Sequence, residues 1–434
     1  MLLKMVIYQI LLGNHSPATW YKEAKRNTDM TWLGRGYKPS RTVWYDFRDR
    51  AGKFIDQLHQ QVVDIAIEQR HLDPSIGALD GSSVSACASR HRMVNLATLN
   101  KRKAILQGAI DASVDPERTL PKWVPPSEVG RADLLARIEH AGEVLAARHQ
   151  QNDARPSGKR KDPNKIVVSL SDPDAPLGLD KRKTYRPLYT IQNVVDPSSY
   201  LIISYTCTAS ATDAGMLPVM IDQTQKITRG SLKRMLADGG YCSILDIRDC
   251  TDRGIELIAP VSASGTSRQN KSREGLPQIP REQFTYDAQA NHYTCPAGEI
   301  LKYKDREKKQ RGGDRFLYQS RFQGDTETCN ACVLSGQCLS GKGGRMIKRT
   351  EGEELLEAQR AKMLEERSKE FYALRGQSVE LIFGDAKGNR RHDRFHGRGL
   401  KRAETETGLL TLARNLHRLD RLQRNASNPM KTAA

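Results

Sequence analysis

The sequence predicts an α/β fold of about two or three domains, built on a mixed sheet with packed helices. Its length of 434 residues, 38% of them hydrophobic, is enough for more than one core. Between residues 166 and 262, short apolar runs typical of strands alternate with segments of helical spacing. Residues 283–345 hold four cysteines in a segment that we expect to be loop-rich and poor in core residues.

The net charge of the chain indicates what kind of partner it binds. The chain has 69 Lys and Arg against 51 Asp and Glu, a formal net charge of +18. This excess favours a polyanion, nucleic acid first and an anionic membrane second. No run approaches about 18 apolar residues, so no segment is predicted to span a bilayer. The opening MLLKMVIYQILL lacks a basic leader and a cleavage site. We interpret it as a core helix, so either the chain begins at a helix or an upstream part has been lost.

Residues 1–70 are predicted to be a helical DNA-binding region. WLGRGYKPSRTVWYDFRDR indicates a turn at Gly34 and Gly36 and a helix capped by Ser40. The next helix follows from the spacing of Phe54, Leu58, Val62 and Ile65. A pair of basic helices could enter a DNA groove, and a packing subdomain with a solvated basic face is the equal alternative.

The predicted sheet comes in two parts. Residues 71–112 hold IGALDGSSVSACAS, a strand bearing Asp80 beside Gly81. Residues 113–165 form a proline-bounded helical and linker insertion. In residues 166–262, two strands flank the turn DPSS and a helix follows, with Asp213 as its expected cap. The strand of RMLADGG, a helix closed by Gly254 and the buried strand IELIAPV complete this part.

The remaining chain is predicted to hold a cysteine-rich insertion (263–345), a C-terminal helical part (346–425) and a tail (426–434). Without a secretory leader, the eight cysteines are expected to be thiols or metal ligands. Four of them can complete a tetrahedral zinc site, with reduced structural thiols as the alternative: Cys295, Cys329, Cys332 and Cys338. The other four are expected to be small core residues.

Three acids could meet at a site. Asp80 and Asp238 each lie in a short apolar strand beside glycine, and two strands of one sheet can bring such side chains within metal-bridging distance. Glu380 lies in SVELIFG, a helix that can present Arg375 and Lys387 along a polar side. Spacing alone leaves each acid more often solvated than catalytic.

Three stretches together resemble the motif regions of DDE transposases of bacterial insertion sequences: ALDGSSVSACASRH, ADGGY and YALRGQSVELIFGDAK. The resemblance runs from about Trp32 to Leu419. The last stretch is similar to the family's Tyr, Arg, Glu, Lys signature, at Tyr372, Arg375, Glu380 and Lys387. Four residues separate Arg375 from Glu380 where some branches have three, which makes the role of Arg375 less secure.

The resemblance implies a ribonuclease-H-like core. It implies that Asp80, Asp238 and Glu380 are catalytic and bind Mg²⁺ or Mn²⁺. Water would release a 3′-hydroxyl at the element end, and that hydroxyl would attack target DNA. The implied partners are double-stranded DNA, as element ends and target, and further copies of the chain in a homodimer or higher assembly. The implied location is the bacterial cytoplasm, at the nucleoid. The DNA-binding residues would be Tyr372, Arg375, Lys387, Arg390 and Arg391.

Other interpretations stay open. Arg375 and Lys387 could form surface ion pairs, and the run from Arg390 to Arg402 could track DNA or be a solvated face. His91 could approach the site or pack locally. The protein could be a truncated or inactive copy that only binds DNA, or a nuclease without strand transfer.

Overall fold

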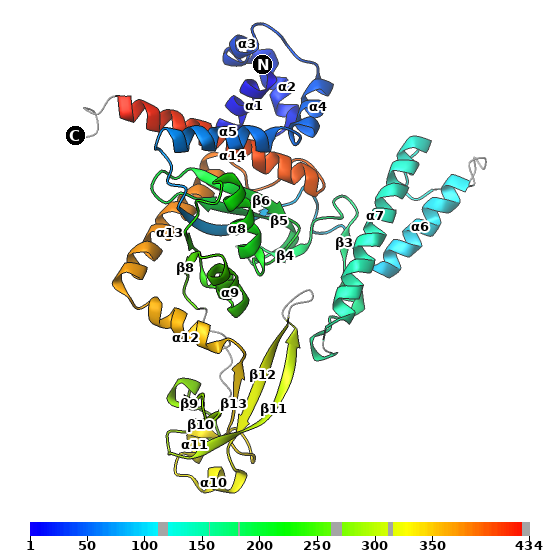
Figure 1. The fold of residues 1–434 in the computed structure, drawn as a ribbon. Coiled ribbons are helices and arrows are strands. Elements are labelled where there is room, and N and C mark those ends of the chain that lie inside the picture. Colours follow the sequence, from blue (N-terminus) through cyan, green and yellow to red (C-terminus); the bar gives the residue numbers. More distant parts are fainter. Residues whose placement is uncertain (112–119, 156, 181–182, 262–270, 311–315, 428–434) are drawn as a thin grey trace. The chain divides into compact units, whose positions relative to one another are not determined.

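The computed structural model describes residues 1–434 except 112–119, 156, 181–182, 262–270, 311–315 and 428–434. Residues 113–119 of the predicted helical and linker insertion, residues 263–270 of the predicted cysteine-rich insertion and most of the predicted tail therefore lie outside the described residues. Helices and strands both contribute, which confirms the α/β prediction (Figure 1). Within the described ranges, no helix has the length and apolar character needed to cross a membrane.

Two compact units make up the chain. Unit 1 comprises Met1–Tyr241, Arg253–Ile258 and Glu370–Ala434. Unit 2 comprises Cys242–Asp252 and Ala259–Lys369. Each unit has its own sheet, and each is described separately below.

Unit 1 begins with helices, as predicted. Ser16 accepts a hydrogen bond from the Ala18 amide at 3.3 Å and Pro17 opens the second helix, both common at helix starts. Trp20 and Trp44 pack edge to face at 6.3 Å between ring centres. Ser40 stands at the expected cap position, but its side chain makes no capping hydrogen bond. The helices are α1 (Leu2–Leu11), α2 (Pro17–Arg26), α3 (Thr28–Leu33), α4 (Arg41–Ala51) and α5 (Ile55–Glu68).

The central sheet of unit 1 has the order β4-β5-β1-β7-β8, and β6 also pairs with β5. β1 is antiparallel to β5 and parallel to β7, and β7 is parallel to β8. The predicted strands are confirmed at these bounds: β1 (Ile76–Ser85), β5 (Tyr185–Val195), β6 (Ile202–Thr208), β7 (Arg234–Leu236) and β8 (Glu256–Ile258). The short strand β4 (Leu177–Leu179) was not predicted.

Helices cover both faces of this sheet. Ser204 of β6 contacts Thr224 of α8 (Met216–Ile227), whereas the neighbouring Tyr205 donates to Asp56 of α5. Because successive strand side chains point to opposite faces, α8 and α5 lie on opposite sides. The expectation that Asp213 caps α8 is wrong. The cap residue is Gly215, and the Asp213 carboxylate instead accepts a hydrogen bond from a β5 side chain.

A helical hairpin follows β1. It consists of α6 (Leu96–Asp111) and α7 (Glu128–Asp153), which share a core that includes Leu106, Ile138 and Leu145. The predicted helix between the prolines and the linker is confirmed as α7. The short pair β2 (Met93–Val94) and β3 (Val168–Ser169) closes the base of the insertion.

Unit 2 corrects the expectation of a loop-rich cysteine segment. It contains an antiparallel sheet in the order β13-β12-β11-β10-β9, with Tyr293, Leu301 and Phe322 in its core. The longest strand, β11, carries charges on both faces in KYKDREKK, so this part of the sequence lacks the alternation that indicates a strand. The bounds are β9 (Thr285–Asp287), β10 (His292–Thr294), β11 (Ile300–Gln310), β12 (Phe316–Gln323) and β13 (Met346–Thr350).

Helices complete the chain. Unit 2 contains α9 (Ile244–Asp252), α10 (Thr326–Ala331), α11 (Ser335–Cys338) and α12 (Glu353–Lys362). The remaining helices confirm the predicted helical C-terminal part: α13 (Glu366–Gly384), a π-helical turn (Asp385–Asn389) and α14 (Leu400–Ser427).

Asn415 should be a major contributor to unit 1 stability. From α14, its fully buried amide accepts from the Ile202 amide at 3.0 Å and donates to the Ile202 carbonyl at 2.8 Å. Asn415→Leu would leave both backbone groups buried without a partner, at about 2–4 kcal/mol. Denaturant unfolding should show this loss, and the exposed Asn425→Leu is the control. Equal stability of the two variants would contradict the assignment.

Candidate active site

Asp80 lies within β1, whereas Asp238 lies two residues beyond the end of the neighbouring parallel strand β7, so the prediction that Asp238 lies in the strand itself is wrong. In the β1–β7 ladder, Ala78 is opposite Leu236. Asp80 comes two residues after Ala78, and Asp238 comes two residues after Leu236. Because the two strands run in the same direction, residues at the same distance from paired positions lie at the same level, so the two carboxylates are neighbours. Their side chains are 22% and 42% exposed, respectively, which leaves them reachable from solvent.

One guanidinium group is shared by the two aspartates. Nη2 of Arg375 lies 3.1 Å from Oδ1 of Asp80 and 3.7 Å from Oδ2 of Asp238. Nε of Arg375 also donates to the Leu79 carbonyl at 3.3 Å. These contacts fix the face of α13 that meets β1. The aspartates therefore converge on a positive group, as their strand positions suggested.

Burial has the largest effect on the pKa of the Asp80 carboxyl. Burial raises the pKa of the Asp80 carboxyl above its usual value. The Arg375 charge and a hydrogen bond from the Gly81 amide act in the opposite direction, and the nearby Asp238 and Asp213 charges add to the rise in pKa.

Glycines close to both aspartates leave room for carboxylate groups. The Asp238 carboxylate accepts from the Gly240 amide at 2.8 Å, and a Cβ at Gly240 would lie 2.9 Å from that carboxylate. At Gly81, a Cβ would lie 2.5 Å from Oδ1 of Asp213. Each acid is therefore followed by a position where a side chain would crowd a carboxylate.

A buried polar chain that the sequence did not reveal supports these turns. Gln192 of β5 is fully buried opposite Gly81 and donates to Asp213 at 2.6 Å. Tyr241, three residues after Asp238, donates to Gln192 at 2.5 Å. The one available signal was a glutamine in the middle of the apolar strand YTIQNVV. The chain connects β1, β5 and the turn that carries Asp238.

Glu380 is not brought to the aspartates. Five residues at about 100° each put it about 140° around α13 from Arg375. It is exposed and lines a surface hollow with Tyr200, Arg390 and Arg414. Across the described ranges, no three His, Cys, Asp or Glu side chains stand close enough to hold one metal ion.

The other predicted site residues have varied surroundings. Lys387 donates to the Ser82 hydroxyl at 2.7 Å and to the Ser83 carbonyl at 2.8 Å, close to Asp80 along β1. Arg390 pairs with Asp385 at 3.3 Å. Arg391 is exposed and Tyr372 is half-buried on α13. His91 accepts a hydrogen bond from its neighbour Arg90 at 3.0 Å.

Comparison with known families gives one match. Residues 294–420 match the family described as transposase DDE domain. The chain carries a transposase DDE domain. No curated protein and no solved structure gave a match. The matched segment includes α13 with Arg375, Glu380 and Lys387, and it excludes the two aspartates.

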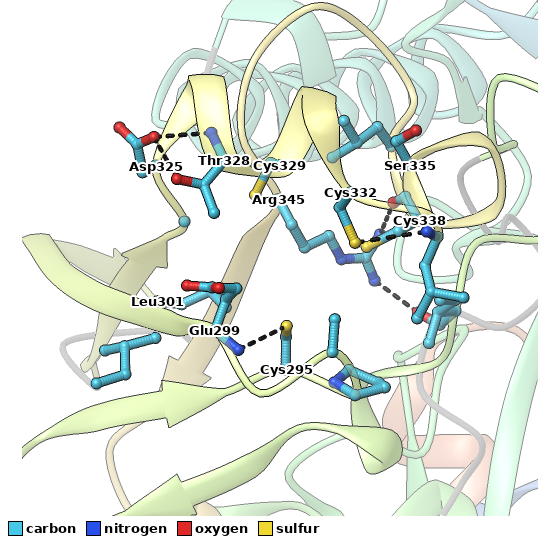
Figure 2. A pocket seen from close by; sticks show the side chains of 17 residues that line it. Cys295, Glu299, Leu301, Asp325, Thr328, Cys329, Cys332, Ser335, Cys338 and Arg345 are labelled. Carbon is cyan, nitrogen blue, oxygen red and sulfur yellow. Dashed lines mark hydrogen bonds between the residues drawn. The ribbon is translucent and has the colours of Figure 1, made fainter.

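The four predicted zinc ligands of the DDE domain line one cavity of about 50 Å³ in unit 2 (Figure 2). The Cys295 sulfur accepts from the Glu299 amide at 3.3 Å, and the Cys332 sulfur accepts from the Leu334 amide at 3.4 Å. Cys329 and Cys338 complete the set. All four are free thiols, and burial raises the pKa of Cys338.

Arg375 should compete with cations for the two aspartates. In an Arg375→Met variant the carboxylates lose their shared guanidinium, so we expect Mn²⁺ to bind about fivefold to tenfold more tightly. Free Mn²⁺ measured by electron paramagnetic resonance checks this. Lys369→Met is the control, because Lys369 lies on the same helix and pairs only with Glu366 among the described residues. Unchanged or weaker Mn²⁺ binding by a folded Arg375→Met protein would refute the competition.

Proposed function

We propose that the chain is a DNA transposase that cleaves the ends of an insertion element and joins them to target DNA. The observation that carries the proposal is the convergence of Asp80 and Asp238 on one cation at the same edge of parallel strands. The transposase DDE domain supports the reaction class. As the resemblance implies, the protein would act at the bacterial nucleoid, with at least two copies assembled on paired DNA ends.

The strand arrangement supports a ribonuclease-H-like core. β6, β5 and β1 are successively antiparallel, and β7 and β8 continue parallel to β1. This order is compatible with the core that the resemblance implies. Asp80 lies on β1, at the centre of the sheet, and Asp238 follows its parallel neighbour β7.

The aspartate pair fits a divalent cation. Oxygens of both carboxylates already face a single positive group, and Mg²⁺ or Mn²⁺ takes carboxylate oxygens as ligands. When bound, two such ions would stabilise the attacking and leaving oxygens of an in-line displacement at phosphorus. Asp80, Asp238 and Glu380 would hold them.

The proposal requires α13 to change. Arg375 must leave the aspartates, and Glu380 must approach them. Two features of α13 favour such a change. Gly376 and Gly384 each weaken a helix by about 1 kcal/mol relative to alanine. The π-helical turn Asp385–Asn389 follows directly, and such turns occur frequently at functional sites. We propose that α13 turns when DNA binds.

The basic residues would hold the DNA backbone. Lys387 is positioned by Ser82 two residues along β1 from Asp80, which suits a contact to a phosphate beside the scissile bond. Arg375, once released from the aspartates, would also face phosphate, together with Tyr372, Arg390 and Arg391. Phosphate contacts of this kind orient the duplex without selecting its sequence.

A second candidate function is DNA binding without catalysis. It is favoured by the exposure of Glu380 on the side of α13 away from the aspartates.

A nuclease without strand transfer is the third candidate. Supplying a duplex with a pre-cut 3′ end separates it from a transposase, because only a transposase would give joined products.

Asp238→Asn should abolish cleavage. Loss of one metal-binding carboxylate removes several kcal/mol of transition-state stabilisation, so the rate should fall by at least about a hundredfold. A labelled element-end duplex with Mg²⁺ reports nicks and joined products. Asp222→Asn, at a surface ion pair with Arg253, is the control and should retain activity. Normal cutting by the Asp238 variant would refute the site.

We also propose that Cys295, Cys329, Cys332 and Cys338 hold a structural Zn²⁺. Two of the sulfurs accept backbone amides, an arrangement that stabilises thiolate charge, and all four line one cavity. Thiolates are preferred zinc ligands. As they stand, the sulfurs do not form a closed ligand set, so binding would draw them together.

Zinc content tests this assignment. Protein purified under reducing conditions should contain about one zinc per chain by elemental analysis, and Cys332→Ser should lose it together with thermal stability of unit 2. Cys87→Ser, in unit 1, should retain the metal. A zinc-free wild-type protein with unchanged stability after chelation would support plain reduced thiols instead.

A further inference from the structure

A basic hollow of about 1160 Å³ lies in unit 1 between the outer face of α13 and the C-terminal half of α14. We call it the arginine groove. It is lined by Arg390, Arg414, Arg418 and Arg421, with Tyr200 and Glu380 among the other residues. It is an open groove, larger than a site for one small anion. None of the α14 arginines belongs to the motifs on which the transposase resemblance rests.

The groove has an excess of positive charge. Four arginines face two carboxylates, Asp385 and Glu380, which leaves a net charge of +2 (4 − 2). Arg390 pairs with Asp385. In the described part of the chain, no carboxylate lies within ion-pairing distance of the other three arginines. Such an arrangement attracts an external anion.

Two of these arginines are held in place by carbonyl groups. Arg414 donates to the Tyr200 carbonyl at 2.6 Å, and Arg418 donates to the Ser199 carbonyl at 2.7 Å. The Arg418 guanidinium also lies 5.3 Å from the Tyr200 ring centre. Carbonyl contacts orient the guanidinium groups and leave their charge uncompensated. The groove is therefore ordered without a ligand.

Burial, together with the charges of Arg418 and Arg390 and against the opposing charge of Asp385, lowers the pKa of Arg414 to about 10. Burial likewise lowers the pKa of Arg418, with Arg421 adding to the effect. Burial is the main cause of both shifts, and mutual repulsion among the neighbouring arginines adds to it. A bound polyanion would relieve that repulsion.

The spacing of the arginines suits a phosphate backbone. Arg414, Arg418 and Arg421 are four and then three residues apart, so they follow one face of α14. At about 1.5 Å per residue they span about 10 Å. Phosphates of one DNA strand advance by about 3.4 Å along the axis, so this row covers about three of them.

We propose that the arginine groove binds the phosphodiester backbone of double-stranded DNA along α14. The inference rests on the proposed transposase function, which supplies DNA as the substrate. It deepens that function by assigning a backbone-binding role to Arg414, Arg418 and Arg421. A duplex in the groove would contact the side of α13 that carries Glu380.

The experiment measures DNA binding without divalent metal, so that cleavage does not contribute. Anisotropy of a labelled duplex is followed at several salt concentrations for wild type and for an Arg418→Gln, Arg421→Ala double variant. Each lost phosphate contact should reduce the slope of log K against log salt by about 0.9. We expect a slope shallower by about 2 and affinity lower by at least tenfold at low salt.

The matched control is Arg424→Ala. Arg424 lies on the same helix, is largely exposed and pairs with Asp420 at 3.0 Å, outside the groove. The Arg424→Ala substitution should leave the slope of log K against log salt unchanged. Arg421→Glu is tested as well, because a substitution at this exposed position should leave the fold intact even where the double variant misfolds. It should weaken DNA binding more strongly than Arg421→Ala, since it adds a negative charge.

The possible outcomes separate this inference from the proposed function. Weakened binding by the groove variants supports the groove even where wild type fails to cleave, in which case only the transposase activity is refuted. Wild-type slope and affinity in the groove variants, with normal cleavage and joining, overturn the groove alone. Failure of wild type to bind duplex DNA overturns both.

Discussion

The shared contact of Asp80 and Asp238 with Arg375 is the interaction on which the site depends. It requires β1 and β7 to run parallel and in register, because a shift of one residue would turn either carboxylate to the opposite face of the sheet. It also requires α13 to lie along β1, since the guanidinium comes from that helix. The sheet, the glycine turns and the buried Tyr241–Gln192–Asp213 chain all contribute to this one convergence.

The same contact shows which side of α13 faces the two aspartates. A helix presents different residues to a neighbour depending on its rotation, and Arg375 and Glu380 lie on clearly different sides. With Arg375 inward, its guanidinium contacts both aspartates, and Glu380 belongs to the surface that also carries the arginine groove. With Glu380 inward, three acids would meet. The glycines of α13 and the π-helical turn after it are the features that would favour the proposed change between these arrangements.

Much of this could be predicted from the sequence, and the exceptions have physical reasons. Asp80 and Asp238 stood out because each was predicted to lie in a short apolar strand beside glycine, a local pattern. Gln192 and Tyr241 could not be found this way, since their meeting depends on the pairing of β5 with β1. The unit 2 sheet was missed because its longest strand, β11, is charged on both faces. The motif order assigned Arg375 and Glu380 to one site, but it carries no information on the rotation of a helix.

The most direct test of the account is a crystal structure of the protein with Mn²⁺ and an element-end duplex, using anomalous scattering to locate the metal. The account predicts an anomalous peak within bonding distance of both Asp80 and Asp238, with Arg375 displaced and Glu380 turned toward them. A structure at saturating Mn²⁺ in which Arg375 still bridges the two aspartates, with no ion beside them, would contradict it.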